Sequence, residues 1–224
     1  MADIAMKGWQ DGKWKVPEWK FDGKPALVIM HMQQGIVGTG EFSGAPHEQE
    51  AKSIKEGRIL ENQKKLLAAF RKKKFPIIFV SVVPNPIGFL PKWGFIFEMS
   101  RQKAPVGRLD NPALKAGTDL IPELERLPGE YLLHHTGICA FTGSHLNDVL
   151  KHHEVHDLVL AGYTAHSTVY NAVVQAVDNW YSVVVARDAT GGPKRDQQCV
   201  DAVLNYMMWM WGLVTTTDDI IAHL

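Results

Sequence analysis

Short apolar runs alternate along the chain with longer segments whose apolar residues recur every three or four positions. One run, residues 76–83 (PIIFVSVV), is almost continuously apolar and rich in β-branched residues. Such a run is typical of a strand that is buried on both faces of a parallel sheet. The pattern predicts strands at residues 26–32, 76–83, 131–134, 157–162, 182–186 and 214–216.

The segments between these runs carry helical spacing. In residues 49–74, for example, Leu60, Leu67 and Phe70 recur among lysines and glutamates. Repeated strand–helix units fold into a parallel sheet covered by helices on both faces. The pattern therefore predicts an α/β fold with one doubly wound sheet, in a single domain over residues 25–224. Helices are predicted at residues 49–74, 143–152, 167–180, 196–211 and in the last residues up to Leu224.

One segment, residues 84–128, breaks this alternation. It is rich in proline and aromatic residues, and it begins where the strand at 76–83 ends. A long irregular insertion at the carboxyl end of a parallel strand is typical of a ligand-binding loop. We expect it to act as a lid whose Trp93, Phe95 and Phe97 form the apolar wall of a pocket. A subunit interface is the alternative.

Two other segments rich in aromatic residues suggest packing surfaces. The N-terminal arm, residues 1–24, carries Trp9, Trp14 and Trp19, and we expect it to pack on its own domain or on a neighbouring subunit. An arm that contacts a membrane surface or a nucleic acid is the alternative. Residues 206–211 (YMMWMW) are apolar on both helix faces, which predicts a buried helix or a subunit contact. A homo-oligomer, dimer or tetramer, is therefore expected.

Charge and composition narrow the functional classes. The 224 residues include 24 basic and 24 acidic side chains, so the net charge is zero and a nucleic-acid partner is not expected. The two cysteines do not form a disulfide framework. The N-terminus lacks the apolar core of a secretory signal, and no run is long enough to cross a membrane. These features predict a cytoplasmic protein without a membrane partner.

Three stretches together resemble one family of enzymes. They are residues 26–37 (ALVIMHMQQGIV), residues 117–177, which include HHTGICAF and LAGYTAHSTVY, and residues 182–190 (SVVVARDAT). Their order and spacing resemble the isochorismatase-like hydrolases, which include nicotinamidases, carbamoyl-amide hydrolases and isochorismatases. The resemblance covers nearly the whole chain from residue 24 onward. It implies a six-stranded parallel sheet of Rossmann-like order, in agreement with the hydrophobic pattern.

The same resemblance locates a catalytic site whose usual residues are replaced. Most members use an Asp, a Lys and a Cys, each at the end of a different strand. The matching positions are His31 (in MHMQ), His135 (four residues before CAF) and Thr168 (six residues after Gly162). Cys139 stands where the family has Ser, and it does not occupy the nucleophile position. A thiolate mechanism at that position is therefore excluded.

The replaced triad favours acid–base chemistry by imidazole. A histidine titrates near neutral pH, so His31 and His135 can serve as general acid or base. Thr168 is open to three interpretations: a nucleophile, an oxyanion contact, or a helix cap. The resemblance also implies an oxyanion hole from the backbone amides of Thr164 and Thr168, and a cis peptide between Tyr163 and Thr164. Some relatives protonate a vinyl ether without Cys, so a non-covalent route by an imidazolium acid is open as well.

We therefore expect a cofactor-free hydrolase that acts on a small cyclic or planar molecule, with lyase or isomerase chemistry also open. Gln33, Ile138 and Tyr163 are further substrate-binding candidates because they flank the predicted site. A catalytically silent homologue used for ligand binding or assembly is one alternative. A metalloenzyme with His31, His135 and His166 as ligands is the other. Only one of the adjacent His134 and His135 is expected to face the site, because neighbouring strand residues point to opposite faces.

Overall fold

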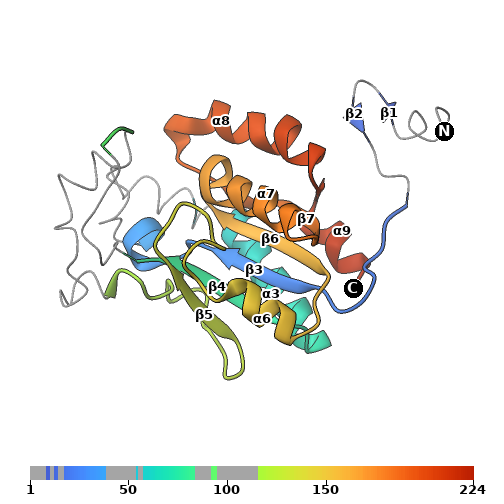
Figure 1. Ribbon diagram of the computed structural model, residues 1–224, viewed down its shortest axis with the longest axis horizontal. Coiled ribbons are helices and arrows are strands. Elements are labelled where there is room, and N and C mark those ends of the chain that lie inside the picture. The colour runs from blue at the N-terminus through green and yellow to red at the C-terminus, as the bar shows by residue number, and fades with distance from the viewer. Residues whose placement is uncertain are drawn as a thin grey trace.

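The computed structural model describes residues 9–10, 13–14, 18–38, 54, 58–83, 92–94 and 116–224. Within these residues, six strands form one parallel sheet in the order β5-β4-β3-β6-β7-β8 (Figure 1). This is a Rossmann-like order, so the predicted fold is confirmed. The strands are β3 (Ala26–Met30), β4 (Ile77–Val82), β5 (Tyr131–His135), β6 (Asp157–Tyr163), β7 (Ser182–Gly191) and β8 (Leu213–Thr215).

Helices cover both faces of this sheet. On one face lie α3 (Arg58–Lys73) and α9 (Thr217–Ala222), and on the other lie α6 (Leu146–His152), α7 (Tyr170–Asp178) and α8 (Gln197–Ala202). Side chains of β3 alternate between the two cores: Val28 and Met30 pack towards α6 and α7, whereas Leu27 and Ile29 pack towards α3. Burial on both faces explains why the sequence of this strand is continuously apolar.

Two elements differ most from the predicted bounds. β7 runs to Gly191 and not to 186, because Thr190 and Gly191 still pair with β6. Side chains of α3 bind this polar end: the Asn62 and Gln63 amides donate to the carbonyls of Asp188 and Ala189, each at 2.9 Å. The predicted helix at 196–211 is divided into η3 (Lys194–Asp196), α8, η4 (Val203–Met207) and η5 (Met208–Met210). The first residues of the predicted helix 49–74 lie outside the described part of the chain, except Ile54.

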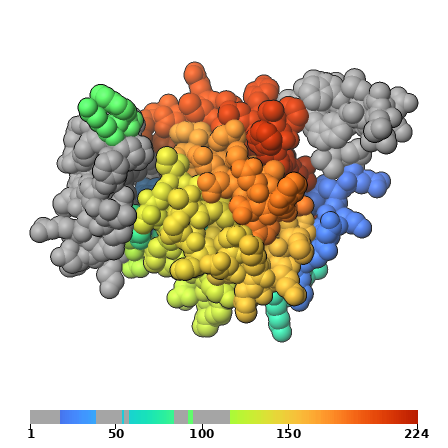
Figure 2. All heavy atoms as spheres, in the orientation of Figure 1, coloured from blue at the N-terminus to red at the C-terminus, as the bar shows by residue number. Residues whose placement is uncertain are grey.

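The segment 206–211 lies at the surface. Tyr206, Met210 and Trp211 are 60%, 62% and 46% exposed, whereas Met208 is buried. This segment belongs to the red rim of the face shown in Figure 2. The interpretation as a buried helix is therefore wrong, and a subunit contact stays a prediction.

The end of the N-terminal arm packs on its own domain. Trp19 stacks on the ring of His223, with 4.0 Å between ring centroids, and its Nε1 donates to Asp219 Oδ2 at 3.3 Å. A separate antiparallel ribbon pairs β1 (Trp9–Gln10) with β2 (Lys13–Trp14). In the described part of the chain, none of the helices has the length and hydropathy needed to cross a membrane.

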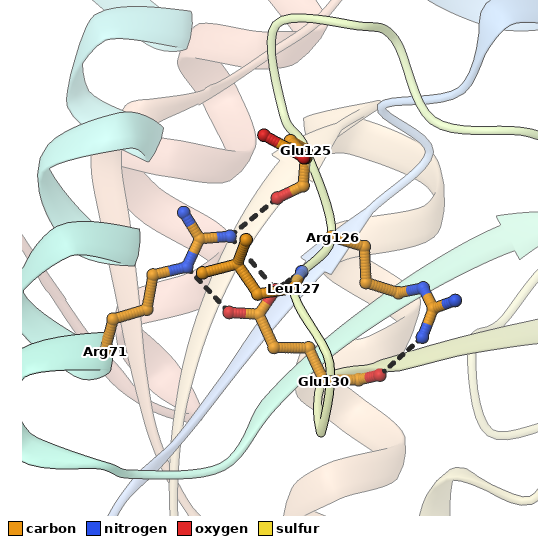
Figure 3. A network of polar contacts seen from close by, with 5 residues as sticks. All are labelled: Arg71, Glu125, Arg126, Leu127 and Glu130. Atoms are coloured by element: carbon orange, nitrogen blue, oxygen red, sulfur yellow. Dashed lines mark hydrogen bonds and ion pairs between the residues drawn. The ribbon is translucent and has the colours of Figure 1, made fainter.

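An arginine joins α3 to the segment that leads into β5 (Figure 3). Arg71 binds both carboxylate oxygens of Glu130, at 2.7 and 3.0 Å, and donates to the Glu125 carbonyl at 2.6 Å. Glu130 Oε2 also accepts from the Leu127 amide, and the Glu130 carbonyl accepts from Arg126. Because β5 is an edge strand and begins directly after Glu130, this network anchors its amino end.

Candidate active site

The three residues predicted to form the catalytic site meet at the carboxyl end of the sheet. His31 follows β3, His135 is the last residue of β5, and Thr168 lies in η2 (Ala165–Val169), the turn after β6. The carboxyl end of β3 lies beside η1 (Gln34–Gly38), on the left in Figure 1. All three side chains are almost completely buried. The structure thus brings His31 together with two residues that are more than a hundred positions away in the chain.

His31 ends β3 by a change of backbone conformation. Its N–H still donates to the Val80 carbonyl at 2.8 Å, as a strand residue would, but its φ is +56°. This left-handed conformation is uncommon for residues other than glycine. The chain leaves the strand at this residue, which directs the imidazole towards β5 and η2.

The rings of His31 and His135 lie end to end. Their Nε2 atoms are 2.6 Å apart, their centroids are 4.9 Å apart, and their planes differ by 17°. The distance between centroids is about the Nε2–Nε2 distance plus one ring radius for each ring. The two rings therefore meet at their Nε2 atoms and lie in nearly one plane. Two lone pairs cannot approach so closely, so one nitrogen must carry a proton and the other must accept it.

The direction of this hydrogen bond depends on which ring nitrogen of His135 carries the proton. Burial lowers the pKa of His135 to about 4, and the backbone of Cys139 and of Gly137 partly offsets this fall. Because Nε2 faces His31, Nδ1 is the other site for that proton. This Nδ1 has no partner of ordinary hydrogen-bond geometry in the described residues. With its proton on Nδ1, His135 accepts at Nε2 and His31 donates.

Thr168 completes a chain of three groups. Its Oγ1 lies 3.2 Å from His31 Nδ1. If His31 carries its proton on Nε2, its Nδ1 is the acceptor for the Thr168 hydroxyl. The proton path then runs from Thr168 through His31 to His135, and we call these three residues the relay. A nucleophile bonded to a base that a third group orients is the general arrangement of nucleophilic catalysis.

The interpretation of Thr168 as a helix cap is wrong. Thr164 is the residue before η2, and Val169 is the residue before α7, and neither makes a side-chain capping bond. Thr168 lies inside the turn, and its hydroxyl faces His31 instead of a backbone amide.

Both histidines of the relay are rarely protonated near neutral pH. Burial, and to a smaller degree the neighbouring His135, holds the pKa of His31 well below its usual value near 6.5. The pKa of His135 is near 4 for the reasons given above. Both rings are therefore neutral near pH 7. A neutral imidazole can accept a proton, whereas the charged form that could donate one is scarce.

A close approach of two strands sets the position of η2. Gly162 has φ +130°, and a Cβ on it would lie 2.2 Å from the Met30 carbonyl oxygen of the neighbouring strand. Only glycine fits this contact between β3 and β6. The peptide bond between Tyr163 and Thr164 is cis, at the position that the family resemblance implies. Thr164 and Thr168, the expected oxyanion residues, therefore belong to one short turn.

The structure places the other substrate-binding candidates in different surroundings. Gln33 is buried, and its amide pairs with the backbone of Val82 and Gly117. Tyr163 packs in the core beside α3, and Ile138 is 48% exposed. Trp93 is 79% exposed with Lys92 Nζ over its ring, so it is not the buried wall that the sequence suggested. Residues Phe95 and Phe97 lie outside the described part of the chain, as does most of the insertion 84–128.

The three candidate metal ligands do not come together. Among the described residues there is no group of three or more His, Cys, Asp or Glu side chains placed to hold a metal. His166 instead lies 3.7 Å from Asp196, so the ligand set with His31 and His135 is wrong. His134 is exposed while His135 is buried, as expected for neighbouring strand residues.

The sequence analysis missed one contribution to the site. The backbone of Gly137 and Cys139, in the turn after β5, faces His135. A glycine two residues after a strand-terminal histidine is the signal that could have indicated this turn.

Comparisons with known proteins agree with the fold and the motifs. The isochorismatase domain family matches residues 25–219. The chain is 26% identical to the uncharacterized isochorismatase family protein YwoC of Bacillus subtilis, over 88% of this chain and 93% of that protein. It is also 26% identical to the ureidoacrylate amidohydrolase RutB of Pseudomonas syringae, over 88% of this chain and 82% of that protein.

Solved structures show the same fold. A cysteine hydrolase from Pseudomonas syringae pv. phaseolicola superposes with a TM-score of 0.71 at 17% identity, over 93% of this chain and 98% of its own. N-carbamoylsarcosine amidase from Thermoplasma acidophilum superposes with a TM-score of 0.62 at 20% identity, over 88% and 98% of the two chains. The family match spans most of the sequence and coincides with the observed sheet, so the chain belongs to the isochorismatase family.

Proposed function

We propose that this chain is a hydrolase in which Thr168 is the nucleophile, His31 the general base and His135 the group that orients the base. The observation that carries this proposal is the geometry of the relay: Thr168 Oγ1 lies 3.2 Å from His31 Nδ1, while His31 Nε2 lies 2.6 Å from His135 Nε2. The proposed mechanism uses groups of the chain together with water and needs no cofactor.

The proposed reaction is an acyl transfer in two steps. His31 Nδ1 takes the hydroxyl proton as Thr168 Oγ1 bonds to the substrate carbonyl carbon, and the same proton then passes to the leaving group as its bond to that carbon breaks. Water, deprotonated by His31, attacks the Thr168 ester, releases the acid and restores the hydroxyl. While His31 is charged, its Nε2–H stays bonded to His135 Nε2. The amides of Thr164 and Thr168 are the proposed donors to the oxyanion.

The direction of the pKa shifts supports a base over an acid. Protonation of a vinyl ether requires a histidine that is charged at working pH. Burial lowers the pKa of both His31 and His135, so the charged form is scarce near neutral pH. A neutral imidazole with a hydroxyl at its free nitrogen is instead ready to act as a base.

Two similar proteins support a carbonyl substrate that carries nitrogen. One is named an amidohydrolase and another an amidase. We infer that the substrate is an amide, carbamoyl or ester derivative of a small cyclic or planar molecule.

The test compares variants of the relay against a panel of amides, carbamoyl compounds, esters, lactones and enol ethers. Thr168→Val keeps the side-chain shape and removes the hydroxyl, so turnover is expected to fall about 10³-fold or more. Thr168→Ser keeps a hydroxyl and is expected to retain activity. His31→Asn tolerates the left-handed backbone but offers no base, and it is expected to lose activity to the same degree.

Mass spectrometry separates the possible mechanisms. An acyl adduct on the peptide that contains Thr168, absent from Thr168→Val, is the expected result. If turnover survives in Thr168→Val, a water molecule activated by His31 is the nucleophile. That result would overturn the role of Thr168 as nucleophile. A wild-type chain with no turnover on the whole panel, but with binding of a panel compound, would establish the silent ligand-binding homologue instead.

A further inference from the structure

We propose that Gln33 is a positioning residue that sets the distance between His31 and His135. Gln33 is fully buried and lies two residues after His31. Its amide nitrogen donates to the carbonyls of Val82 and Gly117, at 3.0 and 2.9 Å, and its Oε1 accepts from the Val82 N–H at 2.7 Å. Both amide protons are used, so the side chain has no donor left for a substrate.

The bonds to Val82 replace a missing strand. The ladder between β3 and β4 ends at Met30 and Val80, because His31 turns the chain away. Val82 lies two residues further along β4, and its N–H and C=O point to the edge that β3 has left. The Gln33 amide binds both groups, as an opposite residue of an antiparallel pair would do. The side chain therefore extends the sheet past the point where the β3 backbone departs.

The other edge of β4 carries His135 at this same level. Val82 and His135 are register partners, and the Val83 N–H donates to the His135 carbonyl at 2.9 Å. The end of β4 is thus held between Gln33 on one side and β5 on the other. Gln33 is in turn tied through its backbone to the turn that carries His31. The spacing of His31 and His135 therefore depends on the two bonds from Gln33 to Val82, together with the bond from the His31 N–H to the Val80 carbonyl.

The hydrogen bond between the histidines is sensitive to this spacing. At 2.6 Å between nitrogens it is short, and hydrogen bonds weaken steeply when donor and acceptor separate or tilt. Misplacement by about 1 Å at a catalytic group costs on the order of a hundredfold in rate. Loss of the Gln33 bonds is therefore expected to disconnect the relay without touching any of its members.

The experiment uses near-isosteric variants of two buried glutamines. Gln33→Met removes all three bonds. Gln63→Met is the matched control, because Gln63 is also fully buried and donates to a carbonyl of the sheet, that of Ala189 on β7, on the far side of β6 from β4. Gln33→Glu keeps the acceptor for Val82 and replaces the two amide protons with at most one carboxyl proton, and it serves if Gln33→Met does not fold.

The main measurement is proton NMR of the imidazole N–H groups near neutral pH. Wild type is expected to show a far-downfield ring N–H that disappears in His135→Gln and persists in Thr168→Val. The Gln33 variant is expected to lose this resonance or shift it upfield, and Gln63→Met is expected to keep it. With a substrate in hand, the Gln33 variant is expected to lose about a hundredfold in kcat with little change in KM.

The catalytic meaning of this inference rests on the proposed function, but the NMR measurement does not. If wild type has the resonance and Gln33→Met retains it at the same position, the positioning role is overturned even if the chain is a hydrolase. If Gln33→Met and Gln63→Met lose the resonance to the same degree, Gln33 has only a general packing role. This outcome would also overturn the positioning role. If the resonance depends on Gln33 and Thr168→Val remains active, the inference stands and the proposed nucleophile falls.

Discussion

Mild acid is expected to destabilise the fold through His135. This side chain has no exposed surface, and burial lowers its pKa in the folded protein to about 4. In the unfolded chain it titrates near its usual value of about 6.5. Between these two pH values, His135 binds a proton in the unfolded state but not in the folded state. Stability is therefore retained above the unfolded pKa and is lost as the pH falls from there towards the folded pKa.

The size of the effect follows from the two pKa values. A histidine that titrates near pH 4 when folded and near pH 6.5 when unfolded lowers the free energy of unfolding by about 2 kcal/mol at about pH 5, relative to about pH 7. His31 contributes in the same direction, because its folded pKa is also well below the usual value. The full loss from His135 is reached only below about pH 4.

Urea unfolding at the two pH values measures this loss directly. We compare wild type, His135→Gln and His145→Gln. The last is a surface control, because the His145 side chain is 86% exposed. His135→Gln is expected to show a pH dependence about 2 kcal/mol smaller than wild type, and His145→Gln is expected to match wild type. The same pH dependence in His135→Gln and wild type would refute the reasoning that this buried ring titrates with folding.

Two further predictions test what holds the site in place. Arg71→Ala removes the bidentate contact to Glu130, whose side chain is 9% exposed, and is expected to cost about 1–3 kcal/mol in urea unfolding. The control Lys65→Ala breaks the exposed 3.8 Å pair with Asp218 and is expected to cost less than about 0.5 kcal/mol. The same loss of stability in Arg71→Ala and Lys65→Ala would contradict the anchoring role of Arg71. Gly162→Ala places a methyl group 2.2 Å from the Met30 carbonyl oxygen and is expected to lower stability by about 3 kcal/mol or more, or to prevent folding. The control is Gly23→Ala, whose new methyl group meets nothing within 4 Å, and its stability in thermal melts is expected to stay within about 0.5 kcal/mol of wild type. A melting curve like that of wild type for Gly162→Ala would contradict the close contact between β3 and β6.

The strands of the fold were predictable where the hydrophobic pattern allowed one assignment only. β3 and β4 were located almost to the residue, because strands buried on both faces are continuously apolar. The polar end of β7 was missed, because Asp188 does not look like a strand residue. It is accommodated there because Asn62 and Gln63 of α3 pair with the backbone around it, and no local pattern reveals a contact over such a sequence distance.

The members of the candidate site were predictable, but their connections were not. Family resemblance and strand ends located His31, His135 and Thr168, which the structure brings together. The sequence predicts Gln33 as a substrate contact, because it lies just past the first strand of the sheet. Its actual partners are set by where the β3 backbone turns away, and this follows from the φ of His31, which the sequence does not specify.

The place of His135 in the sheet has a consequence for local stability. Among the residues that the structure describes, β5 is the outermost strand on its side, and its ladder pairs with β4 alone. Edge elements open at lower free energy than the centre of a sheet, and such openings do not require global unfolding. Amide hydrogen exchange should therefore show β5 exchanging before β3 and β6. The relay would then be intact only for the fraction of time that this edge is closed, so changes that brace or loosen the edge would alter turnover without altering any residue of the site.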